Sequence, residues 1–66
     1  MDDYIPAPDV VNIVRQGNFK LYVYAYRTLT QDELLMCAAN WLKQCHRKKF
    51  PKKGSAKFIT TFGFAD

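Results

Sequence analysis

The sequence predicts a small α+β domain: a sheet of two to three strands with one helix packed on one face, in the order strand, strand, helix, strand. Three observations support this fold class. Apolar and polar residues alternate before residue 30, apolar residues then recur at three- and four-residue spacing, and a second alternating segment follows. A chain of 66 residues has room for one domain, in which we expect residues 1–9 to form an extended acidic N-terminal arm.

The segment from residue 10 to residue 16 permits two interpretations. Asp9 and Gly17 are suitable residues to bracket a short helix. However, Gly17-Asn18 is also a permitted two-residue hairpin turn. The β-branched content of the segment favours the hairpin, because such side chains lose rotamer freedom in a helix; they are Val10, Val11, Ile13 and Val14.

The segment from Asn18 to Leu29 has the two-residue period of a strand, and its aromatic content supports that assignment. A single helix cannot cover both sides of a sheet, so one side of this strand is expected to be solvated, bound to a partner or buried in an oligomer. The side predicted to face the helix carries Phe19, Leu21, Val23 and Ala25, and the other carries Lys20, Tyr22, Tyr24 and Tyr26.

A helix is predicted from Gln31 to His46 or Arg47. Thr30 is a suitable N-cap, and Glu33 can reach back to it to complete a capping box. Residues at helical spacing define one apolar face, formed by Leu34, Leu35, Ala38, Trp41, Leu42 and Cys45.

After the helix, Pro51-Lys52-Lys53-Gly54 is predicted to be a turn, because it combines a proline near its start with a glycine at its fourth position. The alternation that follows predicts a last strand from Lys57 to Phe64. Its apolar side is expected to join the core beneath the helix, through Phe58, Phe62 or Phe64.

Positive charge is concentrated in the second half of the chain. Residues 1–33 hold three basic and five acidic side chains, whereas residues 34–66 hold seven basic and one acidic. Such clustering, in a chain of pI about 9.3, is typical of proteins that contact phosphates. Cations at a helix C-terminus also stabilise the helix dipole, and charged turns favour solubility, so part of the cluster has a purely structural interpretation.

The most direct functional prediction is a small non-catalytic protein that binds DNA or RNA. Lysine predominates, and as a point charge it favours phosphate contact over reading of base sequence. The predicted phosphate contacts are Arg47, Lys48, Lys49, Lys52, Lys53 and Lys57, with Tyr22, Tyr24 and Tyr26 as an aromatic surface for base stacking.

An alternative is a protein-interaction module or inhibitor that docks through the tyrosine side or lends a sheet edge to a partner. Ordinary strand packing or a dimer interface would also explain the tyrosines. A homodimer is expected under both hypotheses, because so short a chain builds only a small core.

Other chemistries are made improbable by the residues present. Cys37 and Cys45 lie about 12 Å apart on the predicted helix, too far for a disulfide, and are expected to be reduced. Together with His46 they lack the spacing of a metal site, and no glycine-rich phosphate loop exists. We therefore expect no metal, cofactor or catalytic activity. We also expect no membrane association, and a cytoplasmic location, since the first residues are acidic and no apolar run has the length of a membrane span.

Overall fold

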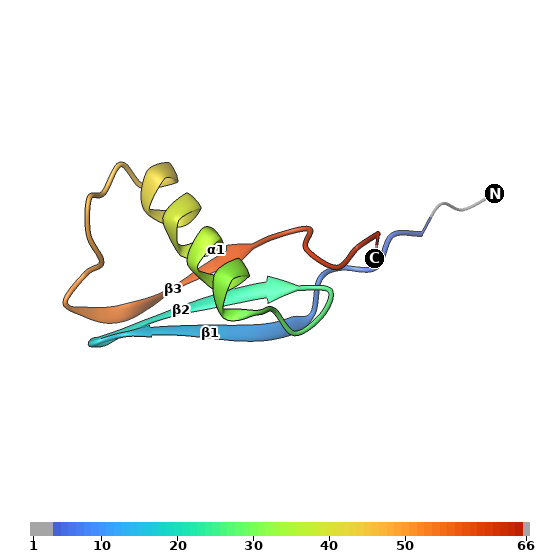
Figure 1. Cartoon of the computed structure of the whole chain (residues 1–66), viewed down its shortest axis with the longest axis horizontal. Coiled ribbons are helices and arrows are strands. Elements are labelled where there is room, and N and C mark those ends of the chain that lie inside the picture. Colours follow the sequence, from blue (N-terminus) through green and yellow to red (C-terminus); the bar gives the residue numbers. More distant parts are fainter. Residues whose placement is uncertain (1–3, 66) are drawn as a thin grey trace.

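The computed structural model describes residues 4–65, and it confirms the α+β class and the predicted order of elements. Strands β1 (Val10–Gln16), β2 (Asn18–Ala25) and β3 (Lys53–Ile59) form one sheet in the order β1-β2-β3. Helix α1 (Gln31–Gln44) lies across one face of the sheet (Figure 1). Asp2 and Asp3 of the predicted arm, and the terminal Asp66, fall outside the described residues.

β1 and β2 form the antiparallel hairpin that the sequence favoured over a short helix. Gln16 pairs with Phe19, so Gly17 and Asn18 are the two turn residues. Gly17 has a φ of 61°, and the pattern of a positive φ at the first turn position fits a type II′ turn. This turn fixes the register, and the register decides which side chains share a face.

The sheet is mixed, because β2 and β3 run parallel. A parallel connection needs a crossover, and α1 supplies it. The ladder continues past the end of β3, where the Thr60 N–H donates to the Tyr24 carbonyl (2.9 Å) and the Tyr26 N–H donates to the Phe62 carbonyl (3.0 Å). The C-terminal end of β2 is thereby tied to the segment that follows β3.

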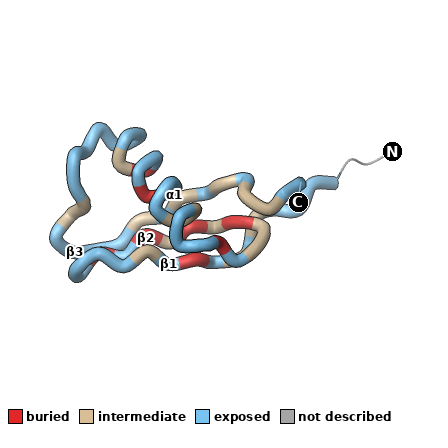
Figure 2. Tube along the Cα trace, viewed as in Figure 1, coloured by how far each residue is buried: buried red, intermediate tan, exposed pale blue. Residues whose placement is uncertain are grey.

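The core lies between the sheet and α1, and the most deeply buried residues are in the central strand (Figure 2). Alternate residues of β2 face the helix, as the sequence predicted. They meet three residues of α1 and one from the connecting loop, so that the buried apolar set is Phe19, Leu21, Val23, Ala25, Leu29, Cys37, Ala38 and Trp41.

The predicted helix face was partly wrong. Leu35 is 55% exposed and Cys45 is also exposed, whereas Cys37, left out of the predicted face, is 1% exposed. The sequence offers apolar residues on more than one side of this helix, so spacing alone did not define which side meets the sheet. Cys37 and Cys45 are both free thiols, in agreement with the sequence.

The predicted capping box at the start of α1 is present. Thr30 Oγ1 accepts a hydrogen bond from the Glu33 N–H (3.2 Å), and the Glu33 carboxylate accepts one from the Thr30 N–H (2.9 Å). The same carboxylate receives two hydrogen bonds of 2.8 Å from the guanidinium of Arg27. Arg27 follows the end of β2, so this pair connects the sheet to the helix N-terminus.

The helix ends earlier than predicted, at Gln44 with Cys45 as C-cap. The Arg47 N–H donates to the Leu42 carbonyl (2.9 Å) and the His46 N–H to the Lys43 carbonyl (3.1 Å), the bonding pattern of a Schellman motif. His46 takes the left-handed position of that motif, with a φ of 56°. The usual glycine signal for a helix end is absent there, which explains why the sequence overestimated the length.

The last strand was also displaced in the prediction. β3 spans Lys53–Ile59 instead of Lys57 to Phe64, so Lys53 and Gly54 belong to the strand and not to a turn. Gly54 has a φ of 105°, a conformation that favours glycine. Because glycine is also typical of turns, the sequence around Gly54 resembled one. Phe58 and Phe62 pack against the core as predicted, but Phe64 is 52% exposed and does not.

Asn12 is the polar residue buried within this fold, at 7% exposure. Its Oδ1 accepts from the Leu29 N–H (2.9 Å), and its Nδ2 donates to the carbonyls of Val10 (3.3 Å), Val23 (3.4 Å) and Arg27 (3.2 Å). These bonds satisfy both the oxygen and the nitrogen of the buried amide. Asn12 therefore holds the loop between β2 and α1 against the hairpin.

Candidate functional site

The loop that carries most of the positive charge is anchored by one aromatic side chain. Phe50 packs against Trp41, with ring centroids 6.0 Å apart and planes at 11°, and against Phe19 at 5.8 Å. Trp41 and Phe19 are themselves stacked at 5.2 Å. Three aromatic rings, from α1, β2 and the loop, thus fix the middle of the loop on the core and leave its lysines exposed on either side.

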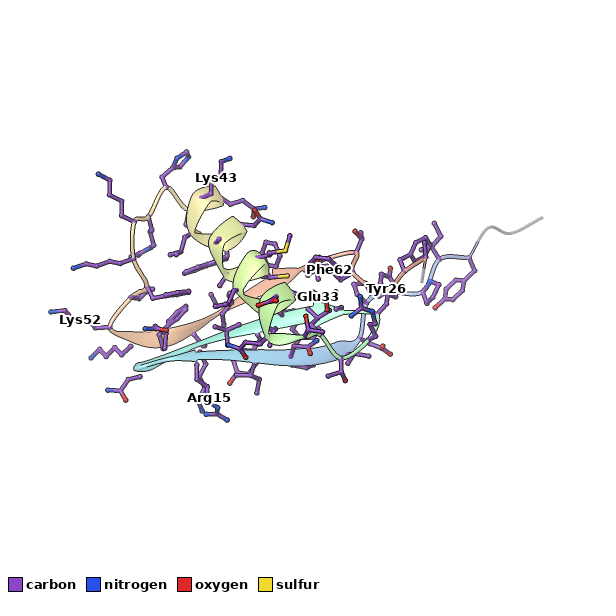
Figure 3. The ribbon with its side chains drawn as sticks, viewed as in Figure 1. Arg15, Tyr26, Glu33, Lys43, Lys52 and Phe62 are labelled. Atoms are coloured by element: carbon purple, nitrogen blue, oxygen red, sulfur yellow. The ribbon has the colours of Figure 1, made fainter. Side chains whose placement is uncertain are left out.

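This loop and the β1–β2 turn border a shallow open groove of about 600 Å³. Three of the predicted phosphate contacts, Lys48, Lys49 and Lys52, line it. Its remaining walls are the hairpin turn and the apolar base of the loop, and we call the whole the basic groove: Gln16, Gly17, Asn18, Leu42, Lys48, Lys49, Phe50, Pro51 and Lys52. Figure 3 shows Lys52 extending from the loop at this end of the molecule and Lys43 at the nearby end of α1.

The other three predicted contacts do not line the groove. Arg47 is exposed and is the last residue of the Schellman motif, and it therefore lies beyond the last helical turn where the sequence placed it. Lys53 begins β3, opposite Asn18. Lys57 is farther along β3 and opposite Tyr22, on the side of the sheet that α1 does not cover. We call that side the open face.

Two basic residues of the open face were not among the predicted contacts. Arg15 and Lys20 are direct partners across the β1–β2 hairpin. Lys20 is in turn opposite Ser55 of β3. Arg15 points away from α1 in Figure 3. The signal was available in the sequence: once Gly17-Asn18 is accepted as the turn, the hairpin register puts both side chains on the same side of the sheet.

Beyond this basic row, the open face becomes aromatic and aliphatic. Tyr22 lies between Ile13 and Lys57, and Tyr24 lies between Val11 and Ile59. The aliphatic members of these rows are exposed to unusual extents for their type: Val11 47%, Ile13 39% and Ile59 62%.

Tyr22 and Tyr24 differ from Tyr26 in their surroundings. The Nζ atom of Lys57 lies 4.9 Å from the centroid of the Tyr24 ring, a cation–π contact worth about 0.5–1 kcal/mol at an exposed site. Tyr26 instead has partners within the chain: its hydroxyl donates to the Pro6 carbonyl (2.8 Å), and its ring packs on Phe64 at 5.1 Å. Tyr22 and Tyr24 are therefore the part of the predicted aromatic surface that adjoins the basic residues.

Acidic side chains are found away from the basic groove. Within residues 4–65 they are Asp9, Asp32 and Glu33, which precede β1 or begin α1. The salt bridge in this part of the chain joins Arg27 to Glu33 at 2.8 Å. The lysines of the loop thus have no carboxylate partner among the described residues, and no described acidic side chain offsets the positive charge of the groove.

Little in the described part of the chain suggests another kind of site. It contains no group of three or more His, Cys, Asp or Glu side chains placed to hold a metal ion. Burial raises the pKa of the Cys37 thiol, which opposes its ionisation to the nucleophilic thiolate. Among residues 4–65, no helix combines the length and the apolar character that crossing a membrane requires.

The comparisons with known proteins yielded no matching family model, no similar curated protein and no similar solved structure.

Proposed function

We propose that this protein is a non-catalytic nucleic-acid-binding protein that contacts phosphates through the basic groove. The observation that carries the proposal is the convergence of Lys48, Lys49 and Lys52 on one groove against the hairpin turn. A groove lined by cations attracts phosphates, because binding releases the counterions condensed on the nucleic acid.

The arrangement supports contact with the backbone more than reading of sequence. The groove cations are lysines, which provide point charges, whereas arginine provides the planar fork suited to base edges. Lys53, Arg15 and Lys20 extend the positive surface from the groove onto the open face. We therefore expect sequence-tolerant binding whose affinity falls steeply with salt.

Fluorescence anisotropy with labelled single-stranded and duplex oligonucleotides of mixed sequence tests the proposal. Binding is expected at low salt and should weaken between about 50 mM and 200 mM salt. In the triple variant Lys48→Gln, Lys49→Gln, Lys52→Gln, the slope of log K against log salt for the duplex should fall by up to about 2.7, since each lost phosphate contact contributes about 0.9.

A matched control separates the groove from net charge alone. The triple variant Thr28→Glu, Gln31→Glu, Ala39→Glu makes the same change in net charge at exposed positions outside the groove. It should retain most of the affinity and nearly the whole salt slope. Absence of binding by the natural sequence at low salt, or equal losses in both triple variants, would contradict the proposal.

A second candidate function is supported by the exposed aliphatic residues of the open face, Val11, Ile13 and Ile59. Exposed apolar residues gathered on one face are typical of protein interfaces, and this face would then serve a protein-interaction module or a homodimer. Salt separates the two candidates, because an apolar interface tolerates added salt whereas phosphate binding does not.

A further inference from the structure

We propose that the open face is a binding site for a single nucleic-acid strand, in which Tyr22 and Tyr24 each stack one base. This inference builds on the proposed function, since it supplies a second element to the phosphate contacts of the basic groove. It specifies the class of ligand: an extended single strand, in preference to a duplex.

The spacing of the two rings favours a single strand. Tyr22 and Tyr24 are two positions apart on β2 and project from the same face, so they are separated by about 6.6 Å along the strand. Adjacent bases in one strand of a duplex are only about 3.4 Å apart. Bases that occupy both tyrosines must therefore be drawn apart and unpaired, as they are on the aromatic platforms of single-strand-binding proteins.

Cations lie next to the tyrosines, where they would contact the sugar-phosphate backbone of a bound strand. The sheet register orders the open face in rows along the strands: Lys53 lies opposite Asn18, and Arg15 lies opposite Lys20. The next row brings Lys57 beside Tyr22. A strand that leaves the basic groove would thus meet Lys53, Arg15 and Lys20 before its bases reach the tyrosines.

The aliphatic residues complete the platform. Ile13 flanks Tyr22, and Val11 and Ile59 flank Tyr24, so each ring is bordered by an apolar side chain that can cover the edge of a stacked base. The Nζ atom of Lys57, 4.9 Å from the Tyr24 ring, rests where a base would stack. An exposed cation–π contact is weaker than base stacking, so a bound base would displace the ammonium group toward a phosphate.

A protein partner or a second copy of the chain would pack on the apolar rows, but the cations beside them would not contribute to that packing. The neighbouring Arg15, Lys20, Lys53 and Lys57 would repel the same residues of a second copy brought face to face. Charge complementarity therefore selects a polyanion for this face.

The test compares the double variant Tyr22→Leu, Tyr24→Leu with Tyr22→Phe, Tyr24→Phe, which keeps both rings. Labelled oligothymidine, oligouridine and a mixed-sequence duplex serve as probes in anisotropy titrations. Loss of each ring should weaken single-strand binding by about 5-fold or more, whereas duplex binding through the basic groove should be unchanged. The phenylalanine variant should bind like the natural sequence, and the thymidine and uridine probes show whether DNA or RNA is preferred.

A measurement without substitution guards against variants that fail to fold. Titration of the natural protein with oligothymidine should shift the ring protons of Tyr22 and Tyr24 upfield, as expected for protons above a base, while those of Tyr26, packed on Phe64, should move little. Uniform small shifts, or shifts confined to the loop, would overturn the inference.

The remaining outcomes distinguish this inference from the function on which it rests. If the natural protein binds the single-stranded probes and the duplex, and the leucine variant binds all of them equally well, the inference fails while the proposed function stands. If the natural protein binds none of the three probes, both fail. If sedimentation shows a dimer that the leucine variant dissociates, with single-strand binding unaffected, the open face is an interface between copies and the inference is wrong.

Discussion

Arg27 and Glu33 form a bidentate ion pair: Nη1 and Nη2 of the guanidinium each donate to one carboxylate oxygen at 2.8 Å. The Glu33 side chain is about one-fifth exposed. Hydrogen bonds from the Arg27 guanidinium and the Thr30 backbone lower the pKa of Glu33 from 4.5 to about 2. One carboxylate thereby fixes the end of β2 and the start of α1.

Stability should therefore depend on pH through Glu33. Because the pKa is lower in the folded state, the pair stabilises the protein fully above about pH 4.5 and progressively less as the pH falls toward 2. In urea titrations, Glu33→Gln should lower the free energy of unfolding at pH 7 and reduce its dependence on pH in that window. Asp32→Asn, on the same turn, is the control; an equal loss of pH dependence in that variant would contradict the assignment.

Gly63 should resist substitution more strongly than Gly17. Both have positive φ, 88° and 61°, but an added Cβ at Gly63 would lie 2.6 Å from Arg27 Cγ, whereas at Gly17 it meets nothing within 4 Å. Gly17→Ala is expected to cost about 1 kcal/mol from backbone strain alone. Gly63→Ala should cost more, because Arg27 must move and its pair with Glu33 is disturbed. If both variants lose the same free energy of unfolding in urea denaturation, Arg27 moves away from the added Cβ at no energetic cost and the prediction is wrong.

These contacts mark the limit of what the sequence could predict. The alternation of Phe19, Leu21 and Val23 is local information, as are the Thr30 and Glu33 capping box and the Gly17 turn, and all three were predicted correctly. Arg27, by contrast, pairs with Glu33 of the helix and lies close to Gly63. No short sequence pattern predicts either contact.

The errors in the elements have the same origin. His46 ends the helix in a left-handed conformation that glycine usually supplies. Gly54 lies within β3 although its neighbours Pro51 and Lys52 resemble a turn. Three of the predicted loop lysines do meet in one groove. Lys20 was correctly placed on the tyrosine side by its alternation, but the position of Arg15 beside it depends on the register of the hairpin.

His46→Gly should stabilise the protein. The histidine is exposed and holds a φ of 56°, where a side chain is strained by about 1 kcal/mol and glycine is not. We expect an increase in the free energy of unfolding of about 0.5–1 kcal/mol in urea titrations. His46→Ala serves as the control, which should gain nothing; a gain in both would implicate the imidazole and not the backbone.

Asn12 should tolerate neither loss nor ionisation of its amide. Asn12→Leu leaves the Leu29 N–H without its acceptor in the core, which is expected to cost about 1–3 kcal/mol. Asn12→Asp keeps that acceptor but places a carboxylate near the carbonyls of Val10, Val23 and Arg27. The aspartate variant should therefore recover stability as the pH is lowered from 7 to about 5, since protonation restores a donor; a pH-independent deficit would contradict this.

Phe50 should link stability to binding. Phe50→Ala removes one ring from the stack with Trp41 and Phe19 while every lysine remains. We expect a loss of about 2 kcal/mol in the free energy of unfolding and faster amide exchange in the loop. Oligonucleotide binding should be weaker although the number of cations is unchanged. Phe50→Leu, which keeps an apolar anchor, should recover part of both. Unchanged affinity in the alanine variant would show that the groove need not be preformed.

The bond from Tyr26 to Pro6 and the packing of Tyr26 on Phe64 bring the first and last described segments together at one end of the molecule. The loop between α1 and β3, which lines the basic groove, lies at the opposite end (Figure 1). A fluorophore, surface tether or fused domain attached at either end would consequently leave the groove as the outermost point. Immobilised protein should thus remain competent to bind oligonucleotides, whichever end is attached.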